Sequence, residues 1–238
     1  MTDAEATPRR VVMTGAGGKI GTAITPFLPR DWDLRRNDRR PGCDDVLDIT
    51  DLDACRAAFA GAAAVVHLAA VPDPRAGWAD LLPANVVGAH NVAAAAADAG
   101  VHRLVMAGSG QAVAGYPLDT QVRVGDRVRP ENLYGATKAW SEALGSWIAA
   151  STPTSVVVLR LGYFADRPPT GADVTTRDKA GWLSPRDCAE LVRSAVEAEG
   201  FRYFVAHGIS ANRYRSLDLT ETCVTLGYRP ADDSWTAG

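Results

Sequence analysis

The sequence contains no uninterrupted apolar stretch long enough to cross a bilayer. Its first ten residues are polar and lack the apolar core of a signal peptide. Basic residues do not dominate either: the formal net charge is -3, so the chain has no basic field for holding nucleic acid. These absences predict a cytoplasmic protein that binds neither a membrane nor nucleic acid.

Patterns that would hold a metal ion or a disulfide are also missing. The chain has four cysteines and four histidines, and no two cysteines form a CxxC pair. They are scattered, at Cys43, Cys55, Cys188 and Cys223 and at His67, His90, His102 and His207. We expect reduced, mostly buried thiols and no metal site.

Short apolar runs alternate with segments of helical spacing along most of the chain. The apolar runs lie at 10–14, 32–36, 63–68, 103–107, 155–161 and 203–206. The segments with helical spacing lie at 18–28, 52–60, 84–99, 133–149, 185–199 and 217–226. This alternation predicts an α/β protein with a Rossmann-like, doubly wound parallel sheet that is covered by helices on both faces.

The length of 238 residues allows one sizeable α/β core but not two full domains, so we expect residues 1–238 to form a single domain. After Gly162 the alternation loosens. Residues 166–179 are rich in Pro, Gly, Asp and Thr, which predicts a loop, and a loop of that length is more often functional than idle. Residues 163–238 are therefore expected to contribute most of the substrate pocket, with Ser184 capping the helix that follows it.

A glycine-rich loop, TGAGGKIG, stands between the first strand and the first helix. Gly15 permits a tight turn, Gly18 lets backbone approach a pyrophosphate, and Gly21 lets the helix pack against the sheet. The start of the helix then offers free N–H groups to phosphates. A plain strand-turn-helix is the alternative, but the position near the N-terminus favours dinucleotide binding. The loop residues expected to contact the cofactor are Gly15, Gly17, Gly18, Lys19, Ile20 and Gly21.

The residues at the end of the second strand bear on whether the cofactor is NAD or NADP. Asp38 can accept hydrogen bonds from ribose hydroxyls and would repel a 2′-phosphate, which favours NAD. Arg39 and Arg40 favour NADP instead, because an arginine after this strand can pair with the 2′-phosphate. We expect NAD, with NADP as the alternative. Asp48 and Ile49, after the next short segment, are candidates for holding the adenine edge.

Tyr134 and Lys138 are four residues apart in a helical segment and so share one helix face. Lysine is scarce, since Lys19 and Lys179 are the only others, which makes a chance pair uncommon. An ammonium beside a phenol lowers the phenol pKa, so tyrosine can act as a base for an alcohol or as an acid for a carbonyl. Ser109 follows a parallel strand and can bind the reacting oxygen beside Tyr134.

These motifs together resemble the short-chain dehydrogenase/reductase superfamily, in its extended, epimerase/dehydratase-like branch, over nearly the whole chain. The matching segments are TGAGGKIG, Asp48-Ile49, His67-Leu68-Ala69-Ala70, Asn85 with Asn91, Ser109, YGATK and Arg160-Leu161-Gly162. The resemblance implies a catalytic triad of Ser109, Tyr134 and Lys138, with Lys138 also holding the nicotinamide ribose. It implies further cofactor contacts at Leu68, Ala69, Ala70, Asn85 and Tyr134.

Within that branch the chain is most similar to the uronate dehydrogenases, which oxidise the C1 hydroxyl of a free hexuronic acid with NAD. The resemblance implies that Arg177, five residues before Trp182, clamps a substrate carboxylate; a solvated loop charge is the alternative. The family's polar pair after the catalytic serine is here Gly110-Gln111, and Tyr163 replaces a small serine. The expected substrate contacts are Ser109, Gln111, Tyr163 and Arg177.

Three functions are compatible with these residues. The first is an NAD-dependent dehydrogenase for a small polyhydroxylated or sugar-acid substrate. The second is a sugar epimerase or a biosynthetic ketoreductase, which would use the same triad. The third is a non-catalytic dinucleotide-sensing regulator, although such proteins typically lack the Tyr-Lys pair. By resemblance, a homodimer would pair through the helices expected at 84–99 and 133–149.

Overall fold

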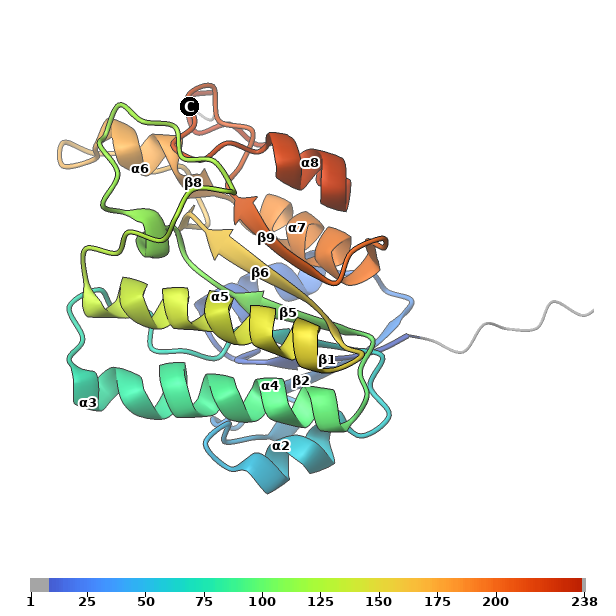
Figure 1. Ribbon diagram of the computed structural model, residues 1–238. Helices are drawn as coiled ribbons and strands as arrows, with labels where there is room; N and C mark the ends of the chain where they lie inside the picture. Colours follow the sequence, from blue (N-terminus) through green and yellow to red (C-terminus); the bar gives the residue numbers. More distant parts are fainter. Residues whose placement is uncertain (1–8, 237–238) are drawn as a thin grey trace, which may run out of the picture.

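The computed structural model, drawn in Figure 1, describes residues 9–236 and arranges them around a parallel sheet of seven strands. The strand order is β3-β2-β1-β4-β5-β6-β9, and all neighbouring pairs are parallel. The strands are β1 (Arg9–Thr14), β2 (Trp32–Asp38), β3 (Asp45–Val46), β4 (Ala64–His67), β5 (Arg103–Ala107), β6 (Ser155–Leu161) and β9 (Tyr203–Gly208). The order reverses between β1 and β4, which confirms the predicted doubly wound, Rossmann-like sheet.

Helices cover both faces of this sheet (Figure 1). One face carries α2 (Leu52–Phe59), α4 (Ala89–Asp98) and α5 (Leu133–Ser151), and the other carries α1 (Lys19–Ile24), α7 (Pro185–Glu197) and α8 (Thr220–Leu226). The remaining elements are α3 (Trp78–Leu81), which runs through a π-helix at Leu82–Gly88 into α4, then β7 (Tyr163–Phe164), α6 (Thr176–Ala180) and β8 (Trp182–Leu183). β7 and β8 form a separate two-stranded sheet.

Strand β6 shows why the central strands are apolar throughout. All seven of its residues are buried. Val157 and Leu159 belong to the core beneath α1 and α7, whereas Val156 and Val158 belong to the core beneath α4 and α5. Because successive side chains of a strand point to opposite faces, both faces need apolar residues when both are covered.

Most predicted elements are confirmed, two of them, β5 and β6, with the same bounds. Ser184 caps α7 as expected, because its Oγ accepts a hydrogen bond from the Asp187 N–H at 3.1 Å. The second strand runs beyond the apolar run at 32–36 and ends at Asp38, where the acid was expected, so Asp38 is held by the sheet itself.

Several boundaries differ from the predictions, and the loop at 166–179, the helix from 84 and the last helix are the most informative. The loop expected at 166–179 contains the start of α6, because Thr175 and Asp178 cap it reciprocally. The helix expected from residue 84 begins earlier, at Trp78, and passes through the π-helix. The last helix begins at Thr220 rather than 217, because the Asp218 N–H bonds to the Val122 carbonyl at 2.8 Å and keeps that segment extended.

A buried ion pair joins α5 to β6. Arg160 donates from Nε to Glu142 Oε1 at 2.8 Å and from Nη2 to Oε2 at 3.0 Å. Both side chains are less than a tenth exposed. The same guanidinium donates to the carbonyls of Val124 and Asp126, each at 3.3 Å. Arg160 therefore fastens α5 and the loop that precedes it to the sheet.

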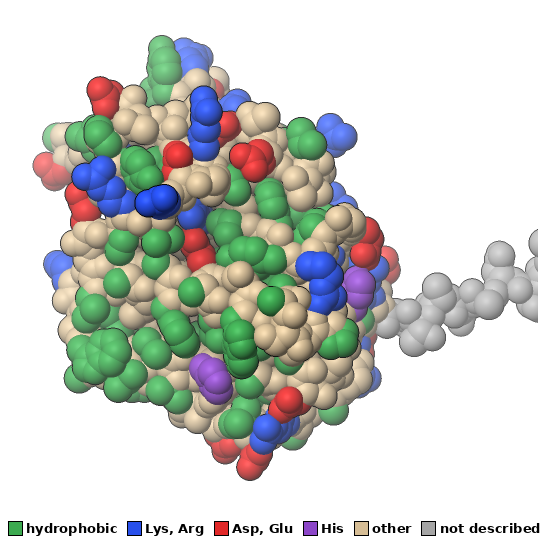
Figure 2. Space-filling model, in the orientation of Figure 1, with side chains coloured by type: hydrophobic (Ala, Val, Ile, Leu, Met, Phe, Trp, Pro, Cys, Tyr) green, Lys and Arg blue, Asp and Glu red, His purple; other side chains and the backbone are tan. Residues whose placement is uncertain are grey.

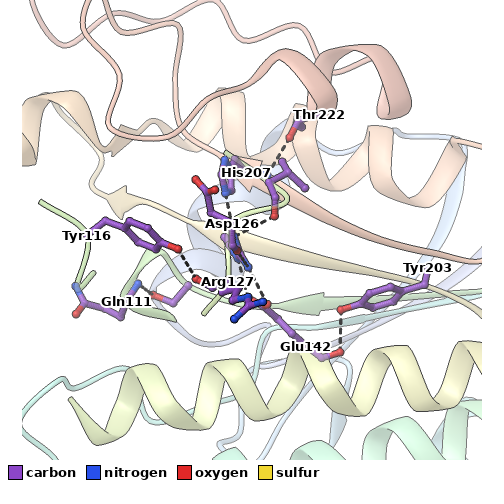
Figure 3. Close-up of polar contacts among 11 residues, drawn as sticks. Gln111, Tyr116, Asp126, Arg127, Glu142, Tyr203, His207 and Thr222 are labelled. Atoms are coloured by element: carbon purple, nitrogen blue, oxygen red, sulfur yellow. Dashed lines mark hydrogen bonds and ion pairs between the residues drawn. The ribbon is translucent and has the colours of Figure 1, made fainter. Parts of the chain in front are cut away.

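Two residues of β9 extend this network (Figure 3). His207 Nδ1 lies 2.9 Å from the Asp218 carbonyl, so Nδ1 carries the proton and Nε2 faces Arg160 Nη1 at 3.4 Å. Burial, with a smaller contribution from the Arg160 charge, lowers the pKa of His207 to about 4. Tyr203 donates to the Glu142 carbonyl at 2.8 Å. The network thus connects α5 with β9 and with the segment before α8.

We expect Glu142→Gln to lower the free energy of unfolding by about 3–5 kcal/mol, because it leaves the buried Arg160 charge without its counter-charge. Asp44→Asn, which disrupts the exposed pair between Arg36 and Asp44, is the control and should cost less than about 1 kcal/mol. Urea unfolding of the two variants measures both values. Equal losses in the two variants would contradict a special role for the buried pair.

Candidate active site

The predicted functional residues gather at one edge of the sheet. Because the seven strands are parallel, their carboxyl ends lie at a common edge. The glycine loop follows β1, Asp38 ends β2, His67 ends β4, and Ser109 follows β5. Residues that are far apart in sequence are therefore brought to one edge of the sheet.

The glycine loop is shaped by backbone contacts that exclude side chains. Gly15 has a φ of +73°, and a Cβ there would lie 2.4 Å from the Ala69 nitrogen. A Cβ on Gly21 would lie 2.6 Å from Ala16 Cα. Gly18 is the N-cap of α1, and no side chain caps this helix. The loop thus leaves the helix start open, and this arrangement fits a phosphate group.

Asp38 is buried beside this loop in a fixed orientation. Its Oδ2 accepts from the Gly17 N–H at 3.1 Å, and its Oδ1 accepts from the Arg40 N–H at 3.0 Å. The Arg40 side chain is mostly exposed and also donates to the Gly17 carbonyl at 3.1 Å. Lys19 points away from Asp38, since its Nζ donates to the Phe164 carbonyl at 2.9 Å. The Asp38 carboxylate and the Arg40 guanidinium therefore both contact the glycine loop, at Gly17.

The two residues expected at the adenine edge are held by local contacts. The Asp48 carboxylate accepts from the Thr50 N–H at 2.9 Å and from the Thr50 hydroxyl at 2.8 Å, which lowers the pKa of Asp48. The Ile49 side chain is buried in the core, where Gly88 leaves room for it. Asn91 donates to the carbonyls of Ile49 and Thr50 at 3.1 and 2.9 Å. Ile49 therefore faces the core with its side chain.

Asn85 fastens the segment after β4 to helix α5. Its Oδ1 accepts from the Val71 N–H at 2.8 Å, and its Nδ2 donates to the Val71 carbonyl at 3.1 Å and to Thr137 Oγ1 at 3.2 Å. This segment also contains Leu68, Ala69 and Ala70, and it passes against Gly15. Asn85 thus holds the crevice wall in place, a role that the sequence did not reveal.

The expected triad is assembled by the start of α5 and the end of β5. Asn132 caps α5, accepting from the Gly135 N–H at 2.8 Å. Tyr134 and Lys138 lie on the buried face of α5, and Lys138 Nζ donates to the Ala107 carbonyl at 2.8 Å. Lys138 Nζ lies 5.7 Å from the centre of the Tyr134 ring. Ser109 lies close enough to Tyr134 to lower the pKa of its phenol in part. The structure therefore brings all three residues together.

Burial controls the protonation of this cluster. Burial raises the pKa of Tyr134, and the hydrogen bond from Ser109 lowers it in part. Burial also lowers the pKa of Lys138 to about 8. The expectation that Lys138 lowers the pKa of Tyr134 is wrong for this arrangement, because Lys138 bonds to a carbonyl and desolvation of the phenol is the larger effect.

His67, for which sequence analysis gave no role, is buried near Lys138. It ends β4, and its Nδ1 lies 2.8 Å from the Thr14 hydroxyl. Burial lowers its pKa to about 3, and the nearby Lys138 charge adds to the shift. Its position at the end of a parallel strand is the signal that could have found it.

The expected substrate residues approach the triad from two loops. Gln111 stands in a 3-10 turn, Gly110–Val113, directly after Ser109. Arg177 on α6 donates to the Ala114 carbonyl at 2.9 Å, at the end of that turn. Tyr163 on β7 is half exposed. The Arg177 guanidinium thus contacts the turn that contains Gln111, whereas Tyr163 lies at the surface.

A cavity of about 780 Å³ borders the glycine loop. It begins at Gly17 and Gly18 and continues past Trp182 to Arg186 and Asp232. None of Ser109, Tyr134 and Lys138 lines it. Within residues 9–236 no helix is long and apolar enough to span a membrane, and no group of three metal-binding side chains is found.

Comparison with known proteins agrees with the motifs. The sequence model of the NAD dependent epimerase/dehydratase family matches residues 11–165. L-arabinose 1-dehydrogenase (NAD(P)(+)) from Haloferax volcanii is 37% identical, over 95% of this chain and 98% of that protein. NAD-dependent glucose-6-phosphate dehydrogenase from the same organism is 35% identical, over 94% of each. A uronate dehydrogenase variant from Agrobacterium tumefaciens, complexed with NAD, is 26% identical over 95% of this chain and 86% of that one, with a TM-score of 0.86.

The depressed pKa of Lys138 predicts a pH-dependent stability. Between about pH 8 and its ordinary value of 10.5, the unfolded chain retains a proton on Lys138 that the folded protein has lost. Raising the pH from 8 to 10 should therefore add about 2 kcal/mol to the free energy of unfolding. Lys138→Met should lack this increment, and Lys179→Met should keep it, in urea unfolding across that range. Parallel curves for the wild type and Lys138→Met would contradict the burial argument.

Proposed function

The chain belongs to the NAD dependent epimerase/dehydratase family, and from this premise we propose that it oxidises a hydroxyl group of a small sugar with NAD. The resemblance to extended short-chain dehydrogenases is thereby confirmed, and the protein is an NAD(P)-dependent oxidoreductase. The observation that carries the proposal is the buried cluster of Ser109, Tyr134 and Lys138 at the sheet edge that also carries the glycine loop.

The residues present fit a nicotinamide dinucleotide. The open start of α1 would receive the pyrophosphate, and Asp38 would accept from the adenosine ribose. When bound, the dinucleotide supplies the hydride acceptor. Asp38 supports NAD, whereas the exposed Arg40 beside it offers a partner for a 2′-phosphate, so NADP is the second cofactor to test. Lys138 would hold the nicotinamide ribose.

The triad provides an acceptor for the proton of the substrate hydroxyl. We assign Ser109 to hold the substrate hydroxyl oxygen and Tyr134 to take its proton. Breaking the O–H bond lets the carbinol carbon release its hydrogen as hydride, and the C–O bond becomes a carbonyl. Tyr134 acts from its phenolate form, so oxidation is favoured as the pH rises toward its raised pKa.

The substrate we propose is a free aldose oxidised at C1, with a uronic acid as the best candidate. Relatives are named for L-arabinose, glucose 6-phosphate and uronate. Arg177 supports an anionic sugar, because it is anchored at one nitrogen by Ala114 and can present the others to a carboxylate or phosphate.

Two alternatives remain distinguishable by experiment. An epimerase or a biosynthetic ketoreductase would use the same triad, and an epimerase would retain its cofactor on purification and show no net reduction of NAD. A non-catalytic sensor would bind the dinucleotide without turnover; the assembled triad gives it the least support. We also propose a cytoplasmic location, because all four cysteines are free thiols.

We expect purified protein to reduce NAD in the presence of at least one aldose or uronic acid, followed by nicotinamide absorbance. Tyr134→Phe should lower kcat by about 10²–10⁴-fold, because it removes the proton acceptor, while the Kd for NAD stays within twofold. Tyr214→Phe, at an exposed tyrosine outside the crevice, is the control and should keep wild-type turnover. Full activity of Tyr134→Phe would exclude the proposed mechanism.

The exposed face of α5 supports the homodimer. Its 19 residues include two charges, Lys138 and Glu142, and both are buried. The solvent-facing side chains are Leu133, Ala136, Trp140, Ala143, Ser146, Trp147, Ala150 and Ser151. Trp78 and Val87, from the neighbouring α3 and π-helix, are also exposed. Figure 2 shows hydrophobic side chains gathered over this side of the molecule, so we propose that two copies pair here.

Sedimentation should therefore give a dimer at micromolar concentration. The double variant Trp140→Glu, Trp147→Glu should sediment as a monomer, because it places charge in the paired face. Val224→Glu alters a highly exposed apolar residue on α8 and should remain dimeric. A monomeric wild-type protein would refute this pairing.

A further inference from the structure

Helix α6, which carries Arg177, is too short to hold its own position. It has five residues, and isolated helices shorter than about 12–15 residues are marginal in water. Its last two carbonyls are bound from outside the helix. The Ala180 carbonyl accepts from the Ser216 N–H at 3.2 Å, and the Lys179 carbonyl accepts from the Ser234 hydroxyl at 2.9 Å. The orientation of α6 is therefore set by segments that are distant in the sequence.

Residues 231–234, which we call the strap, are themselves fixed by two buried side chains. The Asp187 carboxylate, at the start of α7, accepts from two successive N–H groups of the strap at 2.9 and 3.0 Å. Asn212 is fully buried, and its Oδ1 accepts from the Ser234 N–H at 3.1 Å while its Nδ2 donates to the Trp182 carbonyl at 2.9 Å. The strap thus presents the Ser234 hydroxyl to α6 from a backbone that is anchored on α7 and β8.

We propose that Ser234 is a positioning residue for Arg177, and that the preference for an anionic sugar depends on its hydroxyl. This inference rests on the proposed function, in which Arg177 binds the charged group of the substrate. Arg177 lies two residues before Lys179, whose carbonyl Ser234 holds, and its Nη2 donates to the Ala114 carbonyl at 2.9 Å. A shift of α6 therefore moves the guanidinium relative to the turn that follows β5. Paired recognition of a carboxylate or phosphate by arginine is sensitive to such a shift.

Ser234→Ala removes the hydroxyl and leaves the strap backbone in place. The substrates are glucose 6-phosphate and D-glucuronate, which are charged at C6, and D-glucose, which is neutral there. In the wild type, kcat/KM should be higher for the charged sugars. In Ser234→Ala the ratio of charged to neutral kcat/KM should fall about 3–10-fold, the equivalent of one hydrogen bond, through a higher KM for the charged sugars. Ser234→Thr keeps a hydroxyl and should restore the ratio.

The matched control is Thr236→Val. It removes a hydroxyl two residues further along the chain, where the hydrogen bond is local and runs to the Asp233 carbonyl at 3.3 Å. This variant should keep the wild-type ratio. The Kd for NAD should be the same in Ser234→Ala as in the wild type, and assays below the thermal midpoint of each variant separate positioning from loss of the fold.

A double-mutant cycle shows whether Ser234 acts through Arg177. Arg177→Met should abolish the preference for charged sugars, and adding Ser234→Ala to it should change the ratio no further. A further loss in the double variant, or an equal loss for glucose and its charged forms in Ser234→Ala, would overturn the inference. Oxidation of neutral sugars by the wild type without preference for the charged forms would also overturn it, and would leave the oxidation standing. No turnover of any aldose would overturn the proposed function, and this inference with it.

Discussion

Helix α5 meets the 3-10 turn after strand β5, Gly110–Val113, at backbone distance, and the candidate site depends on that contact. Gly135 permits it, because a Cβ there would lie 2.4 Å from the Gln111 carbonyl oxygen. On one side of the contact Lys138 bonds to the Ala107 carbonyl, and on the other Asn132 bonds to Gln111. One close approach of helix and turn therefore holds the start of α5, which carries Tyr134 and Lys138, against the end of β5.

The same helix buries two kinds of charge, with different consequences. Glu142 is compensated by Arg160, so that pair serves the fold and fastens α5 to β6. Lys138 has a carbonyl as its hydrogen-bond partner, and burial lowers its pKa to about 8. A solitary buried lysine costs stability, and sites that carry such a cost are commonly functional. One turn of helix separates a structural charge from the lysine that we assign to the candidate site.

The fold was predictable from sequence where the signal is local. The bounds of β5 and β6 follow from continuous apolar runs, and the triad was found through motif spacing together with the scarcity of lysine. Contacts between distant segments were not predictable. Arg177 bonds to the Ala114 carbonyl, 63 residues away in the sequence. The Asn85 side-chain amide bonds to Val71 and Thr137 rather than remaining available to a ligand. Such partners depend on how the loops cross above the sheet, which periodicity does not encode.

Transfer of isotope from the sugar tests the central claim most directly. A sugar substrate identified by NAD reduction, deuterated at C1, is incubated with the protein and NAD, and the products are read by mass spectrometry. The account predicts that the deuterium appears in the reduced dinucleotide, with one equivalent of NADH formed for each sugar oxidised. Deuterium that remains in a sugar of altered configuration, without net NADH, would contradict it and would identify an epimerase.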